Sequence, residues 1–253
     1  MISSPPSRII SIVPSQTELL FDVGLDEEVI GITKFCVHPS TWFRTKTRVG
    51  GTKQLHIDQI ISLQPDLIIA NKEENVEEQI NELAKHFPVW ISDIKTPDDA
   101  YTMMNSIGEM VNKKAEASSL VKSVEQEIRN WQFQIRNADP KSCAYLIWQN
   151  PLMTIGSDTF IHFMLGIAGF ENVFSDRARY PEITIEEIQQ RNPEFILLSS
   201  EPFPFKQKHA DELKQQLPNS KIILLDGEMF SWYGSRLLKA PEYFRELQMG
   251  LNS

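Results

Sequence analysis

One sequence pattern occurs twice in this chain, and the repeat limits the folds that the chain can adopt. Residues 56–70 read HIDQIISLQPDLIIA, and residues 184–198 read TIEEIQQRNPEFILL. Isoleucines, acidic residues and a proline recur at a constant offset of 128 positions, as Pro65 and Pro193 show (193 − 65). We therefore predict that the chain consists of two related halves.

Each copy of the pattern predicts a helix, a turn and a buried strand. An amphipathic segment breaks at a proline preceded by Gln64 or Asn192, and a short apolar run follows. Further apolar runs flank both copies, at residues 9–13, 89–91, 144–148 and 222–225. Strands that alternate with helices favour parallel sheets covered on both faces. The expected fold class is α/β, with two Rossmann-like lobes that each contain a parallel sheet.

The segment between the halves has no strand signal. Apolar residues at helical spacing, from Leu120 to Ile135, instead predict one long helix from about Lys113 to Asn137. Such a helix extends roughly 37 Å, and a stiff helical connection permits only small rocking of the lobes it joins. The predicted domains are an N-terminal lobe (1–96), a connecting helical segment (97–139) and a C-terminal lobe (140–253).

Composition excludes several functional classes. The net charge of −9 and the pI near 5.1 argue against a nucleic-acid partner, which requires a basic face. The two cysteines, Cys36 and Cys143, lie in different halves, so no disulfide framework is expected. No apolar stretch approaches the ~20 residues that cross a bilayer. Residues 1–8 lack the features of a signal peptide, so either an export signal has been removed or the protein stays inside the cell.

The loops that follow the predicted strands combine aromatic and charged side chains. In parallel sheets the loops at the carboxyl ends of the strands surround the ligand. Aromatic side chains with a few charges suit a sizeable planar or ringed ligand. The predicted ligand-binding residues are Lys34, Trp42, Lys72, Trp148, Arg179, Tyr180, Glu201, Trp232, Tyr233 and Arg236.

Several of these residues also have an ordinary structural interpretation. Trp42 is equally compatible with core packing, and for Trp148, which ends an apolar run, core packing is slightly favoured. Lys72 and Arg179 are equally compatible with solvated surface charge. Residues 232–236 lack a hydrophobic period, which favours exposure toward a ligand.

Three segments carry a family resemblance. RIISIVPSQTELLFDVGL at 8–25, VGG at 49–51 and LQPDLIIA at 63–70 resemble the helical-backbone substrate-binding proteins of ABC importers, the family of the vitamin B12-binding and ferric siderophore-binding proteins. The resemblance covers nearly the whole chain. It implies a solute-binding receptor that holds cobalamin, a ferric siderophore or haem in a cleft between two lobes. No resident cofactor or metal is expected, because the ligand can itself be a metal chelate.

The same resemblance implies a membrane partner. In the family an acidic residue on each lobe docks on the permease, and Glu77 matches the first of these. On the second lobe the matching region is 206–212, where basic residues precede Asp211 and Glu212, either of which could serve.

At the position of Asn71 the cobalamin-binding protein has a tryptophan that stacks on its ligand. The family works in the periplasm or at the cell surface, and a monomer is expected; a native start at Met1 would instead place the protein in the cytoplasm.

Two rival functions differ in class from an organic-ligand receptor. A receptor for a bare metal ion needs three or four converging ligands, and only His38, His209 and Glu201 are placed to meet. An enzyme or an intracellular sequestration protein could act on another small molecule in the same cleft. The chain lacks the nucleophile-elbow, dinucleotide, P-loop and zinc-protease motifs, although Gly50–Thr52 could bind an anion and Glu201 with Glu228 could act as acid and base. Turnover distinguishes an enzyme from a receptor, because a receptor returns its ligand unchanged.

Overall fold

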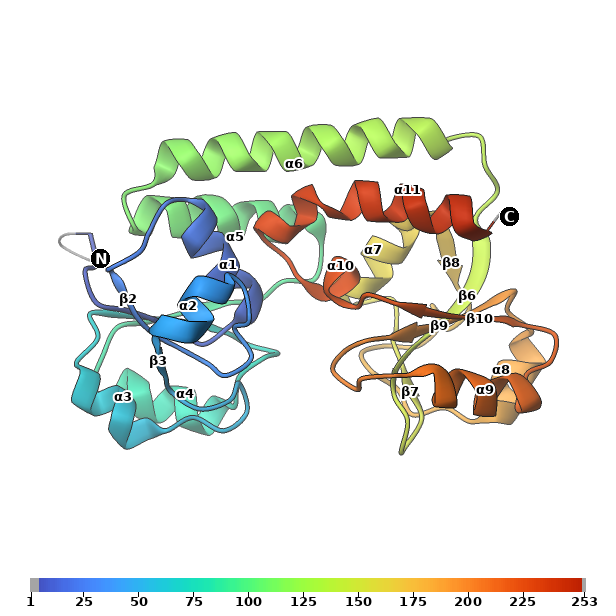
Figure 1. The fold of residues 1–253 in the computed structure, drawn as a ribbon, viewed down its shortest axis with the longest axis horizontal. Coiled ribbons are helices and arrows are strands. Elements are labelled where there is room, and N and C mark those ends of the chain that lie inside the picture. The colour runs from blue at the N-terminus through green and yellow to red at the C-terminus, as the bar shows by residue number, and fades with distance from the viewer. Residues whose placement is uncertain (1–4, 252–253) are drawn as a thin grey trace. The chain divides into compact units, whose positions relative to one another are not determined.

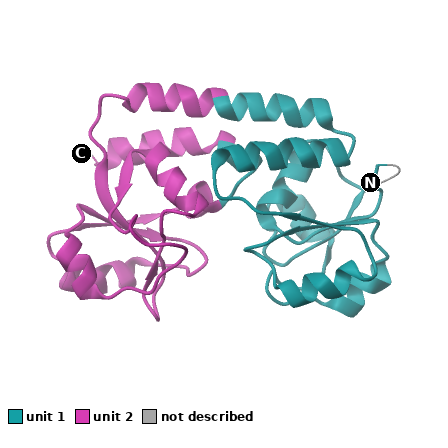
Figure 2. Cartoon of the chain, turned by 180° about the vertical axis from the view of Figure 1, so that it is seen from behind, with its two compact units in different colours: residues 1–125, 232–237 teal, residues 126–231, 238–253 magenta. Residues whose placement is uncertain are grey.

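The computed structural model describes residues 5–251 and confirms the α/β class (Figure 1). The chain divides into two compact units, coloured in Figure 2. Unit 1 comprises residues 1–125 and 232–237, and unit 2 comprises residues 126–231 and 238–253. The sequence placed all of 140–253 in one lobe, whereas residues 232–237 pack in unit 1.

Unit 1 is built on a five-stranded parallel sheet with the order β3-β2-β1-β4-β5. Its strands are β1 (Ile9–Ser11), β2 (Val29–Ile32), β3 (Thr47–Arg48), β4 (Leu67–Asn71) and β5 (Val89–Ser92). Its helices are α1 (Pro14–Asp22), α2 (Ser40–Thr45), α3 (Ile57–Leu63), α4 (Glu77–Ala84), α5 (Pro97–Met110) and the first half of α6 (Lys114–Ile135). The 3₁₀-helix η1 (Ser235–Leu238) begins within residues 232–237, which also belong to unit 1.

Successive side chains of the unit 1 strands point to opposite faces of the sheet, and helices cover both faces. Ile10 and Ile68 point to the same face of the sheet and form a buried cluster with Ile60 of α3 and Leu83 of α4. The intervening residues Ile9 and Ile69 are also fully buried, as expected when helices cover both faces. Figure 1 shows α3 and α4 on one side of this sheet and α5 on the other.

Unit 2 has a five-stranded sheet with the order β10-β9-β6-β7 and with β8 paired to β6. The strands are β6 (Lys141–Trp148), β7 (Met153–Thr154), β8 (Phe170–Asn172), β9 (Phe195–Ser199) and β10 (Lys221–Leu225). The helices are α7 (Phe160–Ala168), α8 (Ile185–Arg191), α9 (Gln207–Gln216), α10 (Glu228–Ser231), α11 (Ala240–Leu251) and the second half of α6. The β6–β7 pair is antiparallel, so this sheet is mixed where a parallel one was expected.

The repeat is preserved in the structure at the same register. α8 and β9 begin and end 128 positions after α3 and β4 (185 − 57). Gln64 and Asn192 end the two helices with left-handed backbone, at φ 47° and 44°. Each then precedes a proline, which cannot continue the helix and directs the chain into the next strand. The repeated pattern therefore encodes the same helix, turn and strand in both units.

The strand-free segment forms two helices instead of one. α5 starts at a capping box, in which Thr96 and Asp99 bond each other's backbone N–H groups, and the chain turns at Asn112 before α6 begins. The long predicted helix is confirmed as α6, and the division between the units falls at residues 125 and 126 inside it. Within residues 5–251, no helix has both the length and the apolar character needed to span a membrane.

Candidate ligand-binding faces

The loops at the carboxyl ends of the parallel strands define one candidate face on each unit. We call the loops 33–38, 49–53 and 71–75, which follow β2, β3 and β4, the unit 1 face. The loops 148–151 and 199–206, which follow β6 and β9, are the unit 2 face. Because the strands within each set are parallel, their carboxyl ends lie along one edge of each sheet.

Two asparagines fix the backbone of the unit 1 face. The side-chain oxygen Oδ1 of Asn71 accepts hydrogen bonds from the N–H groups of Glu73 (2.8 Å) and Glu74 (3.1 Å). The Asn75 side chain accepts the Asn71 N–H (2.8 Å) and donates to the carbonyls of Ile12 (3.2 Å) and Thr52 (3.1 Å). Both side chains are buried, so these bonds join the loops after β1, β3 and β4 without competition from water. Asn71, which the resemblance matched to a ligand-stacking tryptophan, is therefore a structural residue here.

Phe35 is the main apolar group of the unit 1 face. Its ring is 51% exposed, and the Lys34 ammonium lies 5.2 Å from the ring centroid. A Cβ atom on Gly51 would lie 3.1 Å from the ring, so a larger residue there would displace Phe35 or Lys34 by a few tenths of an ångström. Phe35 was absent from the residues chosen from the sequence, although its neighbour Lys34 was among them. An exposed phenylalanine directly after a strand is the signal that could have identified it.

Glu74 presents a carboxylate that has no ion-pair partner among the described residues. Its side chain is half-buried, and no described cation lies within ion-pair distance of it. Burial raises the pKa of Glu74 above its ordinary value; the charge of Lys53 opposes this effect and the repulsion from Glu73 adds to it. A ligand group that donates a hydrogen bond would stabilise this carboxylate. The sequence analysis placed Glu74 in a candidate loop but did not select it.

Two predicted residues of unit 1 have other partners. Lys72 is exposed on its loop and forms an ion pair with Asp93 at 3.0 Å. Trp42 is 2% exposed, packs edge-on against Phe21 and donates its indole N–H to Asp26 at 2.9 Å. Asp26 precedes β2, so Trp42 is held at the amino end of that strand, away from the loops of the unit 1 face. Of the two interpretations, the geometry of Trp42 matches core packing.

Residues 232–236 are buried in unit 1, contrary to the exposure expected from their sequence. The guanidinium of Arg236 donates two hydrogen bonds to the Glu18 carboxylate, at 2.8 and 2.9 Å, and both side chains are less than 10% exposed. The same guanidinium lies 4.9 Å from the ring of Trp232, which also contacts His38 edge-on. Tyr233 is 7% exposed. The paired charge explains how an arginine can be buried here, so Arg236 anchors this segment to α1.

The unit 2 face carries a continuous group of aromatic side chains. Trp148, at the end of β6, is 39% exposed and contacts Phe203 at 5.6 Å between ring centroids. Phe203 in turn contacts Phe205 (4.8 Å) and His209 (5.2 Å). We call Trp148, Phe203 and Phe205 the aromatic group. Trp148 donates its indole N–H to the Asn150 carbonyl, which fixes the ring while leaving part of its surface open.

Glu201, Arg179 and Tyr180 lie in two different places in unit 2. Glu201 belongs to the unit 2 face, where its carboxylate accepts the hydroxyl of Ser231. Arg179 and Tyr180 lie on a segment that runs beside residues 152–157 of the β7 region, bonded to it through backbone groups. The Arg179 guanidinium lies 5.4 Å from the Tyr180 ring. These two residues therefore flank the edge of the sheet and do not follow a strand end.

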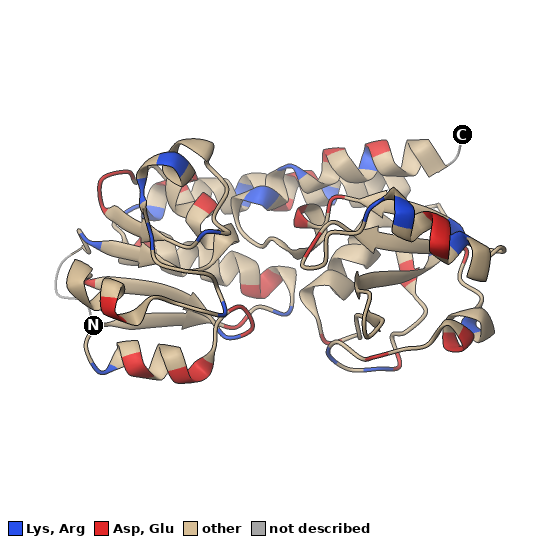
Figure 3. Ribbon diagram, turned by 60° about the horizontal axis from the view of Figure 1, so that its bottom comes forward, with Lys and Arg blue, Asp and Glu red and all other residues tan. Residues whose placement is uncertain are grey.

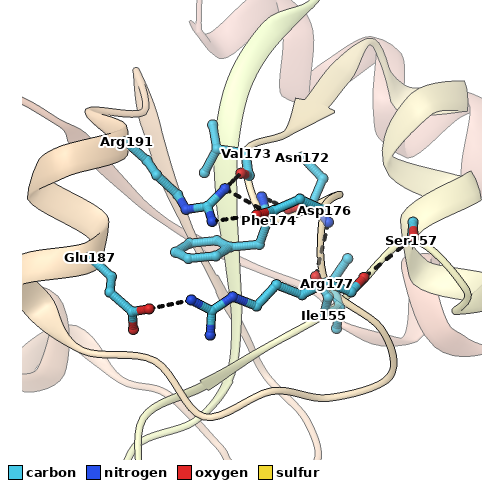
Figure 4. A network of polar contacts seen from close by, with 9 residues as sticks. All are labelled: Ile155, Ser157, Asn172, Val173, Phe174, Asp176, Arg177, Glu187 and Arg191. Carbon is cyan, nitrogen blue, oxygen red and sulfur yellow. Dashed lines mark hydrogen bonds and ion pairs between the residues drawn. The ribbon is translucent and has the colours of Figure 1, made fainter.

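A cluster of charged residues in unit 2 stabilises the loop that contains Arg179 (Figure 4). Arg191 bonds both oxygens of Asp176 at 2.8 Å and lies over the ring of Phe174, and Arg177 pairs with Glu187. The hydrogen bond from Arg191 lowers the pKa of Asp176. These charges compensate one another, so the cluster acts as a support for the loop and leaves no charge for a ligand.

The predicted docking helices differ in charge at their starts. Glu77 and Glu78 occupy the first turn of α4 and are exposed, which suits the positive end of the helix dipole. The first turn of α9 has no acidic residue, and Lys206 and Lys208 are exposed there. Asp211 and Glu212 follow in the next turn (Figure 3 colours both charge types). Asp211 bonds Gln207 and Glu212 bonds Gln149.

Reactive or metal-binding groups are not evident at either face. Between residues 5 and 251, no three His, Cys, Asp or Glu side chains are arranged to hold a metal ion. The thiols of Cys36 and Cys143 are buried, and burial raises the pKa of both.

The sequence and the fold match known proteins over nearly their full length. A family model described as "Periplasmic binding protein" matches residues 9–221. The vitamin B12-binding protein of Pectobacterium carotovorum is 25% identical over 241 residues, which cover 94% of this chain and 86% of that protein. An ABC transporter substrate-binding lipoprotein of Bacillus subtilis is 24% identical and covers 97% of this chain and 81% of its own length. Among solved structures, the apo form of a periplasmic haem-binding protein of Roseiflexus sp. superposes with a TM-score of 0.82 at 19% identity, over 96% of this chain and 97% of that one.

Proposed function

The chain belongs to the periplasmic binding protein family, and from this premise we propose that it is the solute-binding receptor of an ABC importer for a ringed metal chelate. Cobalamin is the first candidate ligand, because a relative that matches 94% of the chain is a vitamin B12-binding protein. Haem or a ferric siderophore is the alternative within the same chemical class. The aromatic group of the unit 2 face is the part of the binding surface that we assign to it.

The observation that supports this proposal most strongly is the aromatic group of unit 2. Trp148 and Phe203 present ring surfaces at the carboxyl edge of a sheet, where α/β proteins bind their ligands. Rigid aromatic side chains bury a large ligand area at low entropic cost. Phe35 offers a second exposed ring on the unit 1 face. Lys34 beside this ring and Glu74 in another loop of the unit 1 face supply polar groups that would orient the ligand.

The partner in this proposal is a membrane permease. Glu77 in the first turn of α4 is the docking residue on unit 1, and Asp211 or Glu212 on α9 takes this role on unit 2. Docking on a permease requires a location outside the cytoplasmic membrane, in the periplasm or at the cell surface. The receptor acts as a monomer, with one ligand per chain.

The enzyme alternative is not retained, because the family consists of solute-binding proteins. A receptor that returns its ligand unchanged also needs no catalytic group. Glu201, one of the two carboxylates considered for acid–base chemistry, is hydrogen-bonded to Ser231, which suits a structural or ligand-orienting role.

A retention experiment tests the proposal. The purified protein is incubated separately with cyanocobalamin, haemin, a ferric trihydroxamate and a ferric triscatecholate, and unbound compound is removed by gel filtration. We expect one of the four to co-elute with the protein, to give its visible spectrum and to have an unchanged mass after extraction. Retention of none of them, or recovery of an altered compound, would contradict the proposal.

A further inference from the structure

His209 replaces the usual residue of a helix cap. A capping box normally ends in Glu or Gln, whose side chain accepts the N–H of the residue before the helix. In α9 the Nδ1 atom of His209 accepts the Lys206 N–H at 2.9 Å instead. His209 is 6% exposed, so water cannot readily replace this bond. The bond requires the neutral ring with its proton on Nε2, because only an unprotonated Nδ1 can accept.

The ring of His209 also supports the aromatic group. It lies 5.2 Å from Phe203 and 5.8 Å from Phe205, and Phe203 contacts Trp148. Phe205 is buried, whereas Trp148 is partly exposed on the unit 2 face. A single imidazole therefore connects the start of α9 to the ring surface that we assign to the ligand.

Protonation of this ring would remove the acceptor for the Lys206 N–H. An imidazolium carries N–H groups on both nitrogens, so Nδ1–H would face the Lys206 N–H, donor against donor.

The acidic residues of the adjoining elements have other partners. Glu201, in the loop that holds Phe203, bonds Ser231. On α9 itself, Asp211 bonds Gln207 and Glu212 bonds Gln149. The loop 148–151 after β6 contributes no charged residue. The carboxylates near the start of α9 are thus occupied and are not bonded to the imidazole.

From this geometry we propose that His209 is a positioning residue for the aromatic group, and that its protonation displaces Phe203 and Trp148 and weakens ligand binding in acid. The binding half of this inference rests on the proposed function, whereas the displacement of the rings is a property of unit 2 alone.

The first test needs no ligand. Histidine ring spectra from NMR, recorded from about pH 8 to about pH 5, report the tautomer and the protonation of His209. The fluorescence of Trp148, isolated as the difference between the protein and its Trp148→Phe variant, reports the ring environment. We expect an Nε2–H tautomer at the higher pH and a change of Trp148 fluorescence that follows the protonation of His209. An Nδ1–H tautomer, or Trp148 fluorescence that is constant while His209 titrates, would overturn the inference.

His209→Gln separates positioning from general destabilisation. Glutamine can accept the Lys206 N–H at any pH in this range, so the fluorescence change should disappear in this variant. The control His86→Gln alters an exposed histidine on unit 1 and should keep the change. A change that persists in His209→Gln would overturn the inference.

Binding of cyanocobalamin, haemin and the two ferric siderophores at both pH values then tests the consequence. We expect the affinity of the retained compound to fall by about tenfold in acid for the native protein, and not for His209→Gln. Equal affinity at both pH values would overturn the inference while leaving the proposed function intact. Absence of binding for all four at about pH 8 would instead contradict the proposed function, and the ligand-free spectra would still decide the role of His209.

Discussion

The two copies of the repeat have the same backbone up to the end of the strand but fix the following loop in different ways. β4 ends at Asn71 and β9 at Ser199, and each side chain accepts an N–H two residues ahead, from Glu73 or Glu201. Beyond this point the chemistry differs. Asn75 joins its loop to neighbouring loops by hydrogen bonds, whereas Phe203, its equivalent in the repeat (203 − 75), packs against other aromatic rings.

The two ways of fixing a loop differ in how much side-chain surface they leave exposed to a ligand. Buried amide hydrogen bonds consume their polar groups and leave little surface for a ligand. Aromatic packing fixes a loop equally well and leaves ring faces exposed, as Trp148 shows. The loop after β4 in unit 1 is therefore held by buried hydrogen bonds, whereas the loop after β9 in unit 2 is held by packed aromatic rings. Each prediction below tests one side of this comparison.

The largest effect is expected from Arg236→Met, which breaks the buried ion pair of unit 1. The variant leaves the Glu18 carboxylate buried without its partner, and such changes cost about 3–5 kcal/mol of unfolding free energy. Urea unfolding of the variant and the native protein measures the cost.

The exposed Arg179→Met serves as the control, because surface substitutions usually remain within about 0.5 kcal/mol. The double variant Glu18→Leu/Arg236→Met should recover part of the loss, since it removes the uncompensated charge. A loss below about 1 kcal/mol for Arg236→Met would show that the pair does not anchor residues 232–237.

Asn75→Ala tests the hydrogen-bonded loop of unit 1. The substitution leaves the N–H of Asn71 and the carbonyls of Ile12 and Thr52 without this partner. We expect a loss of about 1–3 kcal/mol, together with faster amide exchange at Asn71. Asn81→Ala, on an exposed position of α4, should show neither effect. Unchanged exchange at Asn71 would mean that the loop is held by other contacts.

Trp148→Ala tests the aromatic side of the comparison through binding. The removed ring is partly exposed, so stability should change little, whereas affinity for the retained chelate should fall by at least about thirtyfold. Phe133→Ala removes a ring on α6 that is 64% exposed and lies outside both faces, so its affinity should equal that of the native protein. An equal loss of affinity in Trp148→Ala and Phe133→Ala would contradict the assignment of the ligand to the aromatic group.

Glu74→Gln is expected to have the smallest effect. Burial raises the pKa of Glu74, so the ionised form destabilises the folded state, and stability contributed by the protonated form is lost as the pH rises through that pKa. The variant should therefore melt at a slightly higher temperature than the native protein at neutral pH. The difference should vanish below the ordinary glutamate value of about 4.3. Glu78→Gln, on the exposed first turn of α4, controls for net charge.

The sequence predicted the regular parts of the fold because their signals are local. The repeat defined α3, β4, α8 and β9, and helical spacing defined α6. Each of these elements depends on residues within a few turns of one another, so periodicity and proline placement suffice.

The residues whose surroundings differ from expectation depend on distant partners. The burial of Arg236 follows from Glu18, which lies 218 residues earlier in the chain. Trp42 is held by Asp26 on a turn that carries no regular pattern. The position of Phe35 depends on Gly51 in another loop, and the contact of His209 with Phe203 joins a helix to the preceding loop, so both arise only in the folded protein. Side-chain type indicated the ligand class from the sequence, but the tertiary partners determine which side chains remain available.

A calorimetric titration tests the central claim most directly. The native protein is titrated with cyanocobalamin, haemin, a ferric trihydroxamate and a ferric triscatecholate, alongside Trp148→Ala and Phe133→Ala. The account predicts saturable binding of one compound at one per chain, weakened in Trp148→Ala and unchanged in Phe133→Ala. Absence of heat for all four compounds, or binding that Trp148→Ala does not weaken, would contradict it.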